Sequence, residues 1–392
     1  MRVLVVNAGS STLKLALIDG DDQTLASREI AAARAVVDRA EVRAALVGEL
    51  GQADAVGHRI VHGGARFDAP IRVDDQVESA LRELTDLAPL HQPKSLAALD
   101  AVSAELPALP AVACFDTAFH ATMGPAATTY ALPESWRAQW PIRRFGFHGL
   151  SHAWIAQRVP ELLGRDGGEL RIVSCHLGAG ASLCAIANGR SRDTTMGFTP
   201  LEGLVMATRS GSVDPGLLLW LLEHGALSPA TLADALEHES GLLGLAGTAD
   251  MRAVVERANK ADSTARLALD VYVHRLRCGI AAMAAALGGI DVLAFTGGVG
   301  ERSAVVRALA VDGLGFLGLA IEPSHNETAI ADTDISAANA AARTVVVTAR
   351  EDLEIARQTR SVLGARRSLA RTSNVLGDER CKSSNQRSTG RS

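Results

Sequence analysis

An internal repeat constrains the fold of this chain more than any other feature of its sequence. The segment Val3–Gly20 aligns without a gap with Ile172–Gly189, at an offset of 169 residues. Each copy has two short apolar runs around a turn of Gly, Ser and Ala and ends in Asp-Gly or Asn-Gly, a pattern that predicts a β-hairpin. Small turn residues let backbone N–H groups approach an anion closely. We therefore expect two related α/β lobes that each offer a turn to one polyphosphate; two ordinary hairpins are the alternative.

The length of the chain, 392 residues, fits two domains, since a domain usually holds ~100–200 residues. Hydrophobic residues make up 47% of the chain and aromatic residues only 4%, so the cores must be aliphatic. We place the N-terminal lobe at residues 1–117 plus 352–364, and the C-terminal, nucleotide-binding lobe at residues 118–351. Residues 365–392 hold seven Arg and Lys residues against two acids, which predicts a disordered basic tail.

Charge and cysteine content exclude several classes of function. A net charge of −5 gives no basic surface for nucleic acid, so any phosphate site must be built locally. The N-terminus lacks the pattern of a signal peptide, and no apolar run approaches the ~18 residues of a membrane span. We therefore expect a cytoplasmic protein with no nucleic-acid or membrane partner. The cysteines agree, because five scattered residues without metal-binding spacing fit a reduced compartment: Cys114, Cys175, Cys184, Cys278 and Cys381.

In the first copy of the repeat, Lys14 lies within the strand predicted over Leu13–Ile18. It has the same parity as Ser10 and Thr12 and the opposite parity to the leucines, so the polar groups share one face of the strand. The second copy has Leu183 at this position, which makes the first turn the chemically active one. A surface lysine on an exposed strand is the alternative.

Two charged residues lie within or directly after predicted strands. Arg59 is inside the apolar strand Ala55–Val61, where a guanidinium needs an anionic partner because burying an unpaired charge is costly. That partner belongs either to a structural ion pair or to a bound substrate. Asp116 follows the strand Ala111–Phe115, and open α/β sheets place ligand contacts just beyond the carboxyl ends of their strands.

The segment RRFGFHGLSH contains His148 and His152, four residues apart. This spacing could bind zinc on a helix, but the intervening Gly and the missing HExxH glutamate argue against a metal. His148 fits a hydrogen-bond donor to an anion better. A helix is expected from Ser151 through Val159.

Strand, Gly-rich turn and helix follow one another near the end of the second lobe. Asp291–Thr296 predicts a strand, residues 297–301 (GGVGE) a turn, and Ser303–Leu309 a helix. A helix N-terminus directed at an anion is typical of nucleotide-binding sites, although many α/β turns contain two glycines.

Other patterns predict the remaining elements. Asp214-Pro215 and Ser228-Pro229 are N-cap and first-turn pairs that begin helices, the first of them apolar over Leu217–Leu222. Residues 27–53, rich in Ala and charges, are predicted to be helical. Helices are also predicted over Val77–Leu87, Ser263–Leu287 and Glu351–Leu363, a last strand over Thr344–Thr348, a Pro-bracketed turn over Pro89–Pro93 and a loop over Gly244–Arg252.

Together these motifs resemble the acetokinase family. The matching segments span residues 3 to about 360 in order: VLVVNAGSSTLK, GHRIVHGG, LAPLHQP, FDTAFH, RRFGFHGLSH, CHLGAGAS, TTMGFTPLEGLVMATRSGSVDP and FTGGVGERS. The resemblance implies reversible conversion of acetate and ATP to acetyl phosphate and ADP. It also implies a duplicated actin-like (ribonuclease H-like) α/β fold of two lobes with the active site in the interlobe cleft, which agrees with the repeat.

The resemblance implies a role for each matching residue. The catalytic set has two guanidiniums that hold the carboxylate and then the transition state, a catalytic acid and a transition-state donor: Arg59, Arg209, Asp116 and His148. The acetate pocket is lined by Arg59, Val61, Leu90, Phe147 and Pro200. The pair expected to bind Mg²⁺, with Mn²⁺ as a possible substitute, is Asn7 and Glu351. The ATP-binding residues are Ser10, Thr12, Lys14, His176, Leu177, Gly178, Ala179, Gly180, Asp250, Met251, Arg252, Gly298, Val299, Gly300, Glu301 and Arg302.

The chemistry of the reaction requires these residue types. Phosphoryl transfer spreads negative charge over the equatorial oxygens, and arginine forks match carboxylate and phosphate geometry. A carboxylate needs no general base, so we expect direct attack on the γ-phosphorus, with Asp116 orienting Arg209 or the magnesium shell. Two positions depart from the family pattern, Ala179 and Arg302, where Asn is usual; we expect Arg302 to contact phosphate or ribose in compensation.

Other functions are weighed against acetate phosphorylation. A propionate or other short-chain carboxylate kinase differs by little, because one methylene in a pocket is worth only ~1–3 kcal/mol. A non-catalytic actin-like nucleotide-binding or chaperone module would not need Arg59, Asp116, His148 and Arg209. The resemblance further implies a homodimer, for which the apolar Leu217–Leu222 stretch is a candidate buried surface.

Overall fold

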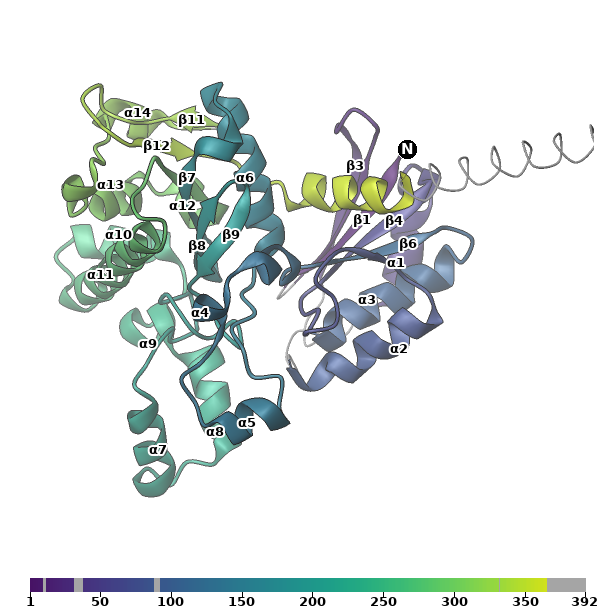
Figure 1. Cartoon of the computed structure of the whole chain (residues 1–392), viewed down its shortest axis with the longest axis horizontal. Helices are drawn as coiled ribbons and strands as arrows, with labels where there is room; N and C mark the ends of the chain where they lie inside the picture. The colour runs from purple at the N-terminus through teal and green to yellow at the C-terminus, as the bar shows by residue number, and fades with distance from the viewer. Residues whose placement is uncertain (10–11, 32–37, 88–91, 331, 365–392) are drawn as a thin grey trace, which may run out of the picture. The chain divides into compact units, whose positions relative to one another are not determined.

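The computed structural model of the chain describes residues 1–9, 12–31, 38–87, 92–330 and 332–364 (Figure 1). Within these ranges the chain forms two compact units. The first contains Met1–Ile60, Ala69–Cys114 and the chain from Asp352, and the second contains Val61–Asp68 and Phe115–Glu351. The predicted tail, residues 365–392, lies outside the described residues, as do Ser10 and Leu90. No helix in the described ranges is both long and apolar enough to cross a bilayer.

The units contain six-stranded mixed sheets of the same topology. The strand order is β3-β2-β1-β4-β6-β5 in one and β9-β8-β7-β10-β12-β11 in the other. In both sheets the first two strands of the chain pair antiparallel and the fourth lies parallel to the first. This correspondence confirms the predicted duplication. The strands are β1 (Val3–Ala8), β2 (Thr12–Ile18), β3 (Thr24–Ala31), β4 (Ala55–Ile60), β5 (Ile71–Arg72), β6 (Ala111–Phe115), β7 (Arg171–Leu177), β8 (Ala181–Ala187), β9 (Arg190–Thr194), β10 (Val292–Thr296), β11 (Thr333–Asp334) and β12 (Arg343–Val346).

The two copies of the repeat differ in the turn that follows their second strand. Asn188 and Gly189 have φ angles of 55° and 67°, as a two-residue turn between β8 and β9 requires. In the first copy the loop is longer, and the left-handed residue is Asp22, with φ of 62°. The carboxylate of Asp19 accepts hydrogen bonds from the N–H groups of Asp21 and Gln23, both at 2.9 Å, which stabilises the wider loop. The hairpin turn predicted at Asp19-Gly20 is therefore present, but it extends to Gln23.

The helices are built from the predicted caps where the sequence has them. Asp214 accepts the N–H of Gly216 at 2.7 Å and Ser228 accepts that of Thr231 at 3.1 Å, as predicted. The helices are α1 (Arg39–Leu46), α2 (Asp75–Glu83), α3 (Gln92–Glu105), α4 (Pro125–Thr128), α5 (Glu134–Gln139), α6 (Gly149–Leu163), α7 (Pro215–His224), α8 (Pro229–Asp234), α9 (Gly241–Ala246), α10 (Met251–Asn259), α11 (Ser263–Ala286), α12 (Gly297–Arg302), α13 (Ala304–Asp312), α14 (Pro323–Thr328) and an unlabelled helix over residues 351–364.

Apolar side chains alternate between the two faces of each sheet. In the first unit Leu4 and Val6 of β1 pack with α1 and α3, and the 351–364 helix covers the other face (Figure 1). That helix comes so close to β4 that a Cβ on Gly57 would lie 2.7 Å from Ile355 Cγ2. In the second unit Val173 and Cys175 of β7 pack toward α11, and residue 172 packs toward α6. Helices therefore cover both faces of each sheet, which leaves the ends of the strands available for a site.

Three secondary-structure predictions are wrong. Residues 27–31 belong to strand β3, not to a helix, because they pair residue by residue with β2 and satisfy its edge. Parts of the predicted loop over Gly244–Arg252 are helical, since α9 ends at Ala246 and α10 begins at Met251. The Gly-rich segment after β10 is itself the short helix α12 rather than a turn.

Candidate active site

A row of polar side chains crosses three adjacent strands of the first unit. Asn7 of β1 lies opposite Lys14 of β2, and its Oδ1 accepts a hydrogen bond from Nη1 of Arg59 on β4 at 3.1 Å. Thr12 shares the face of Lys14, as its parity predicts. The structure thus brings together four predicted site residues of this unit, Lys14, Asn7, Arg59 and Thr12, on one face of its sheet.

In the second unit the turn within His176–Gly180 joins β7 to β8, and Gly180 lies close to two predicted catalytic side chains. A Cβ at Gly180 would lie 3.2 Å from both Cε1 and Nε2 of His148 and 3.5 Å from Nη1 of Arg209. The carbonyl of Ala179 accepts the N–H of Ala207 at 3.0 Å, which ties the turn to the loop that carries Arg209. His148 and Arg209 therefore meet at the turn that the sequence predicts for phosphate.

His148 is held in an uncommon backbone conformation. Its φ of 56° places it in the left-handed region directly before α6, where non-glycine residues are rare and often functional. Its Nδ1 hydrogen-bonds Ser182 Oγ at 2.9 Å, and its ring stacks on that of His176 with centroids 4.3 Å apart. The second hydrogen bond of Ser182 goes to Nε2 of His152, also at 2.9 Å. His148 and His152 thus both hydrogen-bond the hydroxyl of Ser182.

The histidine network continues inward. Nδ1 of His152 hydrogen-bonds Ser174 Oγ at 2.9 Å, and Nδ1 of His176 hydrogen-bonds Ser151 Oγ at 2.8 Å. Burial lowers the pKa of His152 well below its ordinary value, so its ring is neutral. In the described part of the chain no three His, Cys, Asp or Glu side chains gather as a metal site.

Arg209 lies in a largely buried position. Nη1 donates to the carbonyl of Pro200 at 3.4 Å, and Nε lies 2.9 Å from Oε2 of Glu237. Burial lowers the pKa of the guanidinium, and the negative charge of Glu237 opposes this effect. Two predicted residues, Arg209 and Pro200, are thereby brought together, and Glu237 joins them as a residue that the sequence analysis missed.

Two of the apolar residues predicted for the acetate pocket, Val61 and Phe147, belong to one core cluster. Val61 is 7% exposed and Phe147 1% exposed, and both pack in the cluster that contains Met206. The ring of His62 meets the ring of Phe147 edge-on, with centroids 5.4 Å apart. Asp116 is buried after β6, and its carbonyl accepts the N–H of Gly149 at 2.8 Å, one residue beyond His148.

The predicted nucleotide segment 298–302 forms most of α12 and adjoins the predicted phosphate turn, His176–Gly180. A Cβ at Gly297 would lie 2.8 Å from the carbonyl of Leu177, so α12 begins against the end of β7. The side chain of Glu301 accepts the N–H groups of Gly297 and Ala349, both at 3.0 Å. Glu301 thus caps its own helix, which is a structural use of a residue predicted to bind ATP.

Arg307, a second residue missed by the sequence analysis, supports α12 from α13. Its buried guanidinium donates to the carbonyls of Gly300 and Glu301, both at 2.8 Å, and to Asn326 Oδ1. Burial lowers the pKa of Arg307 to about 10. The remaining predicted segment begins α10, where Asp250 accepts the N–H of Arg252 and also pairs with its exposed guanidinium at 3.0 Å.

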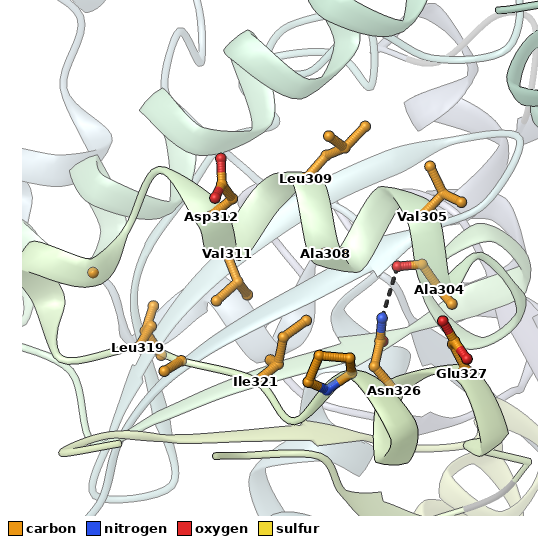
Figure 2. Close-up of a pocket in the computed structure, with 13 residues that line it drawn as sticks. Ala304, Val305, Ala308, Leu309, Val311, Asp312, Leu319, Ile321, Asn326 and Glu327 are labelled. Carbon is orange, nitrogen blue, oxygen red and sulfur yellow. Dashed lines mark hydrogen bonds between the residues drawn. The ribbon is translucent and has the colours of Figure 1, made fainter. Parts of the chain in front are cut away.

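Figure 2 shows a pocket of about 740 Å³ in the second unit, between α13 and residues 315–327. Its walls are mostly aliphatic, and Val311 of α13 points toward Leu319 and Ile321. Asn326 donates to the carbonyl of Ala304 at 2.9 Å. None of the residues that line this pocket is a predicted site residue, so we give it no part in the chemistry.

Known proteins resemble the chain along most of its length. Residues 26–357 match the model of the acetokinase family. A curated acetate kinase of Leifsonia xyli subsp. xyli is 45% identical, over 93% of this chain and 99% of that protein. The crystal structure of Porphyromonas gingivalis acetate kinase aligns with a TM-score of 0.84 at 34% identity, covering 92% of this chain and 99% of that one. A propionate kinase from Francisella tularensis aligns with a TM-score of 0.86 at 33% identity and the same coverage.

Proposed function

This chain belongs to the acetokinase family, and we propose on that premise how its residues phosphorylate acetate with ATP. The enzyme interconverts acetate and ATP with acetyl phosphate and ADP. The observation that carries the assignment of residues is the meeting of His148 and Arg209 at Gly180, on the turn of the second repeat. A donor and a guanidinium at a phosphate-binding turn are the parts that stabilise a transferring phosphoryl group.

The transfer is a direct in-line displacement. A carboxylate oxygen of acetate forms a bond to the γ-phosphorus as the bond to the β-phosphate oxygen breaks, and ADP leaves with the electron pair. Arg59 and Arg209 hold the carboxylate and then the charge on the equatorial oxygens, and His148 donates to the same oxygens. Asp116 moves no proton, because an ionised carboxylate is already a nucleophile; it orients Arg209 or the metal shell. A covalent phosphoenzyme that survives acid quenching of a reaction with labelled ATP would contradict this mechanism.

Asn7 and Glu351 would hold the divalent ion that accompanies ATP. Amide and carboxylate oxygens are the hard ligands that Mg²⁺ prefers, usually one or two per site together with phosphate and water, and Mn²⁺ accepts the same donors. When bound, the ion neutralises charge on the phosphates. Replacing Glu351 by Gln should raise the Mg²⁺ concentration at half-maximal activity; an unchanged requirement in this variant and in Asn7→Ala would exclude the pair.

Three segments of the second unit bind the nucleotide: His176–Gly180, residues 250–252 and residues 298–302. Arg302 is exposed on α12, where a guanidinium can reach a phosphate or a ribose hydroxyl. Replacing it by Asn should raise KM for ATP with little change in kcat. An unchanged KM would leave Arg302 without a role in binding.

Propionate is the second candidate acceptor, because a propionate kinase is among the similar structures. The pocket residues Val61, Phe147 and Pro200 decide between a methyl and an ethyl group, a difference worth only ~1–3 kcal/mol. Trapping the acyl phosphate with hydroxylamine, with acetate, propionate and butyrate offered in parallel, measures the preference. Absence of trapped product with every acid would contradict the kinase assignment itself.

We further propose a homodimer that buries α7, in a cytoplasmic enzyme without nucleic-acid or membrane partners. No residue of α7 is buried within the chain, and Leu219 and Trp220 are 62% and 54% exposed. Exposed apolar side chains gathered on one helix are typical of a protein interface. Sedimentation velocity should show a dimer that Leu219→Glu dissociates; an unchanged sedimentation coefficient would place the interface elsewhere.

A further inference from the structure

The loop that carries Arg209 is fixed by main-chain hydrogen bonds to one neighbouring segment, residues 236–243. The N–H groups of Ser240, Leu242 and Leu243 donate to the carbonyls of residues 208, 206 and 207 at 2.9–3.0 Å, and the N–H of Ser210 donates to the carbonyl of residue 236 at 3.1 Å. Gly241 has a φ of 61°, and a Cβ there would lie 2.7 Å from the carbonyl oxygen of Arg209. The two segments are therefore in close contact along their whole length.

This neighbouring segment overlaps a π-helical turn, Ala235–Glu239, a rare element that often lies at functional sites. The hydroxyl of Ser240 donates to the carbonyl of Ala235 at 2.8 Å and closes the turn. The hydroxyl of Thr208 donates to the carbonyl of Glu237 at 2.8 Å. The turn thereby fixes the backbone of Glu237 against the residue that precedes Arg209.

The side chain of Glu237 enters the same contact. Its Oε2 lies 2.9 Å from Nε of Arg209, and the two side chains are 10% and 14% exposed. This Oε2 is buried, so the two opposite charges lie together away from water. Attraction between opposite charges is strong where water is excluded.

The contact with Glu237 also determines how the guanidinium of Arg209 is oriented. The group is planar, so fixing two of its nitrogens fixes its plane. Glu237 contacts Nε, and the carbonyl of Pro200 accepts from Nη1, the atom that faces Gly180 of the phosphate turn. We propose that Glu237 is a positioning residue that orients Arg209 toward the transferring phosphoryl group, an inference that rests on the proposed function of Arg209.

The test replaces Glu237 by Gln, which keeps its size and removes its charge. We expect kcat to fall by about ten- to a hundredfold, the range found for residues that orient a ligating side chain, while KM for ATP stays within about twofold. Glu239→Gln is the matched control, because Glu239 is exposed on the same π-helical turn and should leave kcat unchanged. An unchanged kcat in Glu237→Gln would overturn the proposal.

A double-mutant cycle separates positioning from a general loss of structure. Residues that act as a unit give non-additive effects, so Glu237→Gln should cost little further activity in an Arg209→Lys background. Equal fold losses in both backgrounds would overturn the proposal. Should Glu237→Gln fail to fold, Glu237→Asp keeps the charge on a shorter side chain and enters the same cycle. If Arg209→Lys itself leaves activity normal, the proposed role of Arg209 fails, a result distinct from failure of Glu237 alone.

Discussion

Ser182 Oγ lies 2.9 Å from Nδ1 of His148, and this contact determines which ring nitrogen of His148 carries the proton. A serine hydroxyl has one proton, and Ser182 also contacts Nε2 of the neutral, buried His152. When His152 donates from Nε2, Ser182 must donate to His148, and the proton of a neutral His148 ring then lies on Nε2. That nitrogen is the one beside Gly180.

Replacing Ser182 by Ala should therefore lower kcat by about ten- to a hundredfold, because the ring of His148 can then take the wrong tautomer. Steady-state kinetics, with thermal unfolding measured in parallel, check this expectation. Ser95→Ala is the control, because Ser95 is also buried but its Oγ has no hydrogen-bond partner within the described residues. A lower melting temperature without a loss of kcat would show that Ser182 only supports the fold.

Replacing Arg209 by Lys should lower kcat by about a thousandfold or more. An arginine that serves transition-state charge is worth ~10³–10⁵ in rate, and lysine cannot reproduce its planar fork. Lysine keeps a positive charge beside Glu237, so the fold should survive. Steady-state kinetics measure the effect. The matched control is Arg266→Lys, the same substitution in an exposed ion pair. Near-normal turnover would remove Arg209 from its proposed role.

A methyl group at Gly180 should interfere with the site directly. The Cβ of Gly180→Ala would lie 3.2 Å from the ring of His148, tighter than most real Cβ contacts, so the ring must shift. A small displacement of a catalytic group can cost about a hundredfold, and we expect a loss of kcat of that order with a near-normal melting temperature. Gly124→Ala, where a Cβ meets nothing within 4 Å, should leave both quantities unchanged. Full activity in Gly180→Ala would argue against a tight contact at the turn.

His58 should make the stability of the enzyme depend on pH. Its ring is 1% exposed in β4, neither nitrogen has a hydrogen-bond partner within the described residues, and burial lowers its pKa to about 4. An unfolded chain binds this proton at its ordinary pKa of about 6.5, so the free energy of unfolding falls as the pH drops from 6.5 to 4, by about 3 kcal/mol from this residue.

His58→Leu should therefore flatten the fall in melting temperature between pH 7 and pH 5 and raise the melting temperature at pH 5. Thermal unfolding at several pH values measures both effects. The control is His325→Asn, because His325 is exposed; its melting temperature should match that of the wild type at each pH. The other buried histidines, such as His120, whose pKa burial also lowers to about 4, will keep part of the slope. Parallel curves for His58→Leu and the wild type would contradict the assignment.

Much of the fold could be predicted because the relevant signals are local. The 169-residue repeat predicted the duplicated sheets, and β2 and β8 begin and end at that offset. Parity placed Lys14 on the face of Thr12, and the caps at Asp214 and Ser228 began helices where expected. Strand β3 was missed because its residues favour a helix locally and become a strand only by pairing with the edge of β2.

The sequence by itself determined the repeat, the family and the residue types of the site, since these depend on neighbours along the chain and on the residues of short motifs. Only the tertiary structure decided which partners orient them. Ser182 lies 34 residues from His148 along the chain. Two helices separate Arg209 from Glu237, which lies in a segment without any recognisable motif. A hydrogen bond or ion pair depends on distances of about 3 Å. Such distances arise from how the strands, the turn and the π-helical segment pack together, which no pattern along the chain encodes.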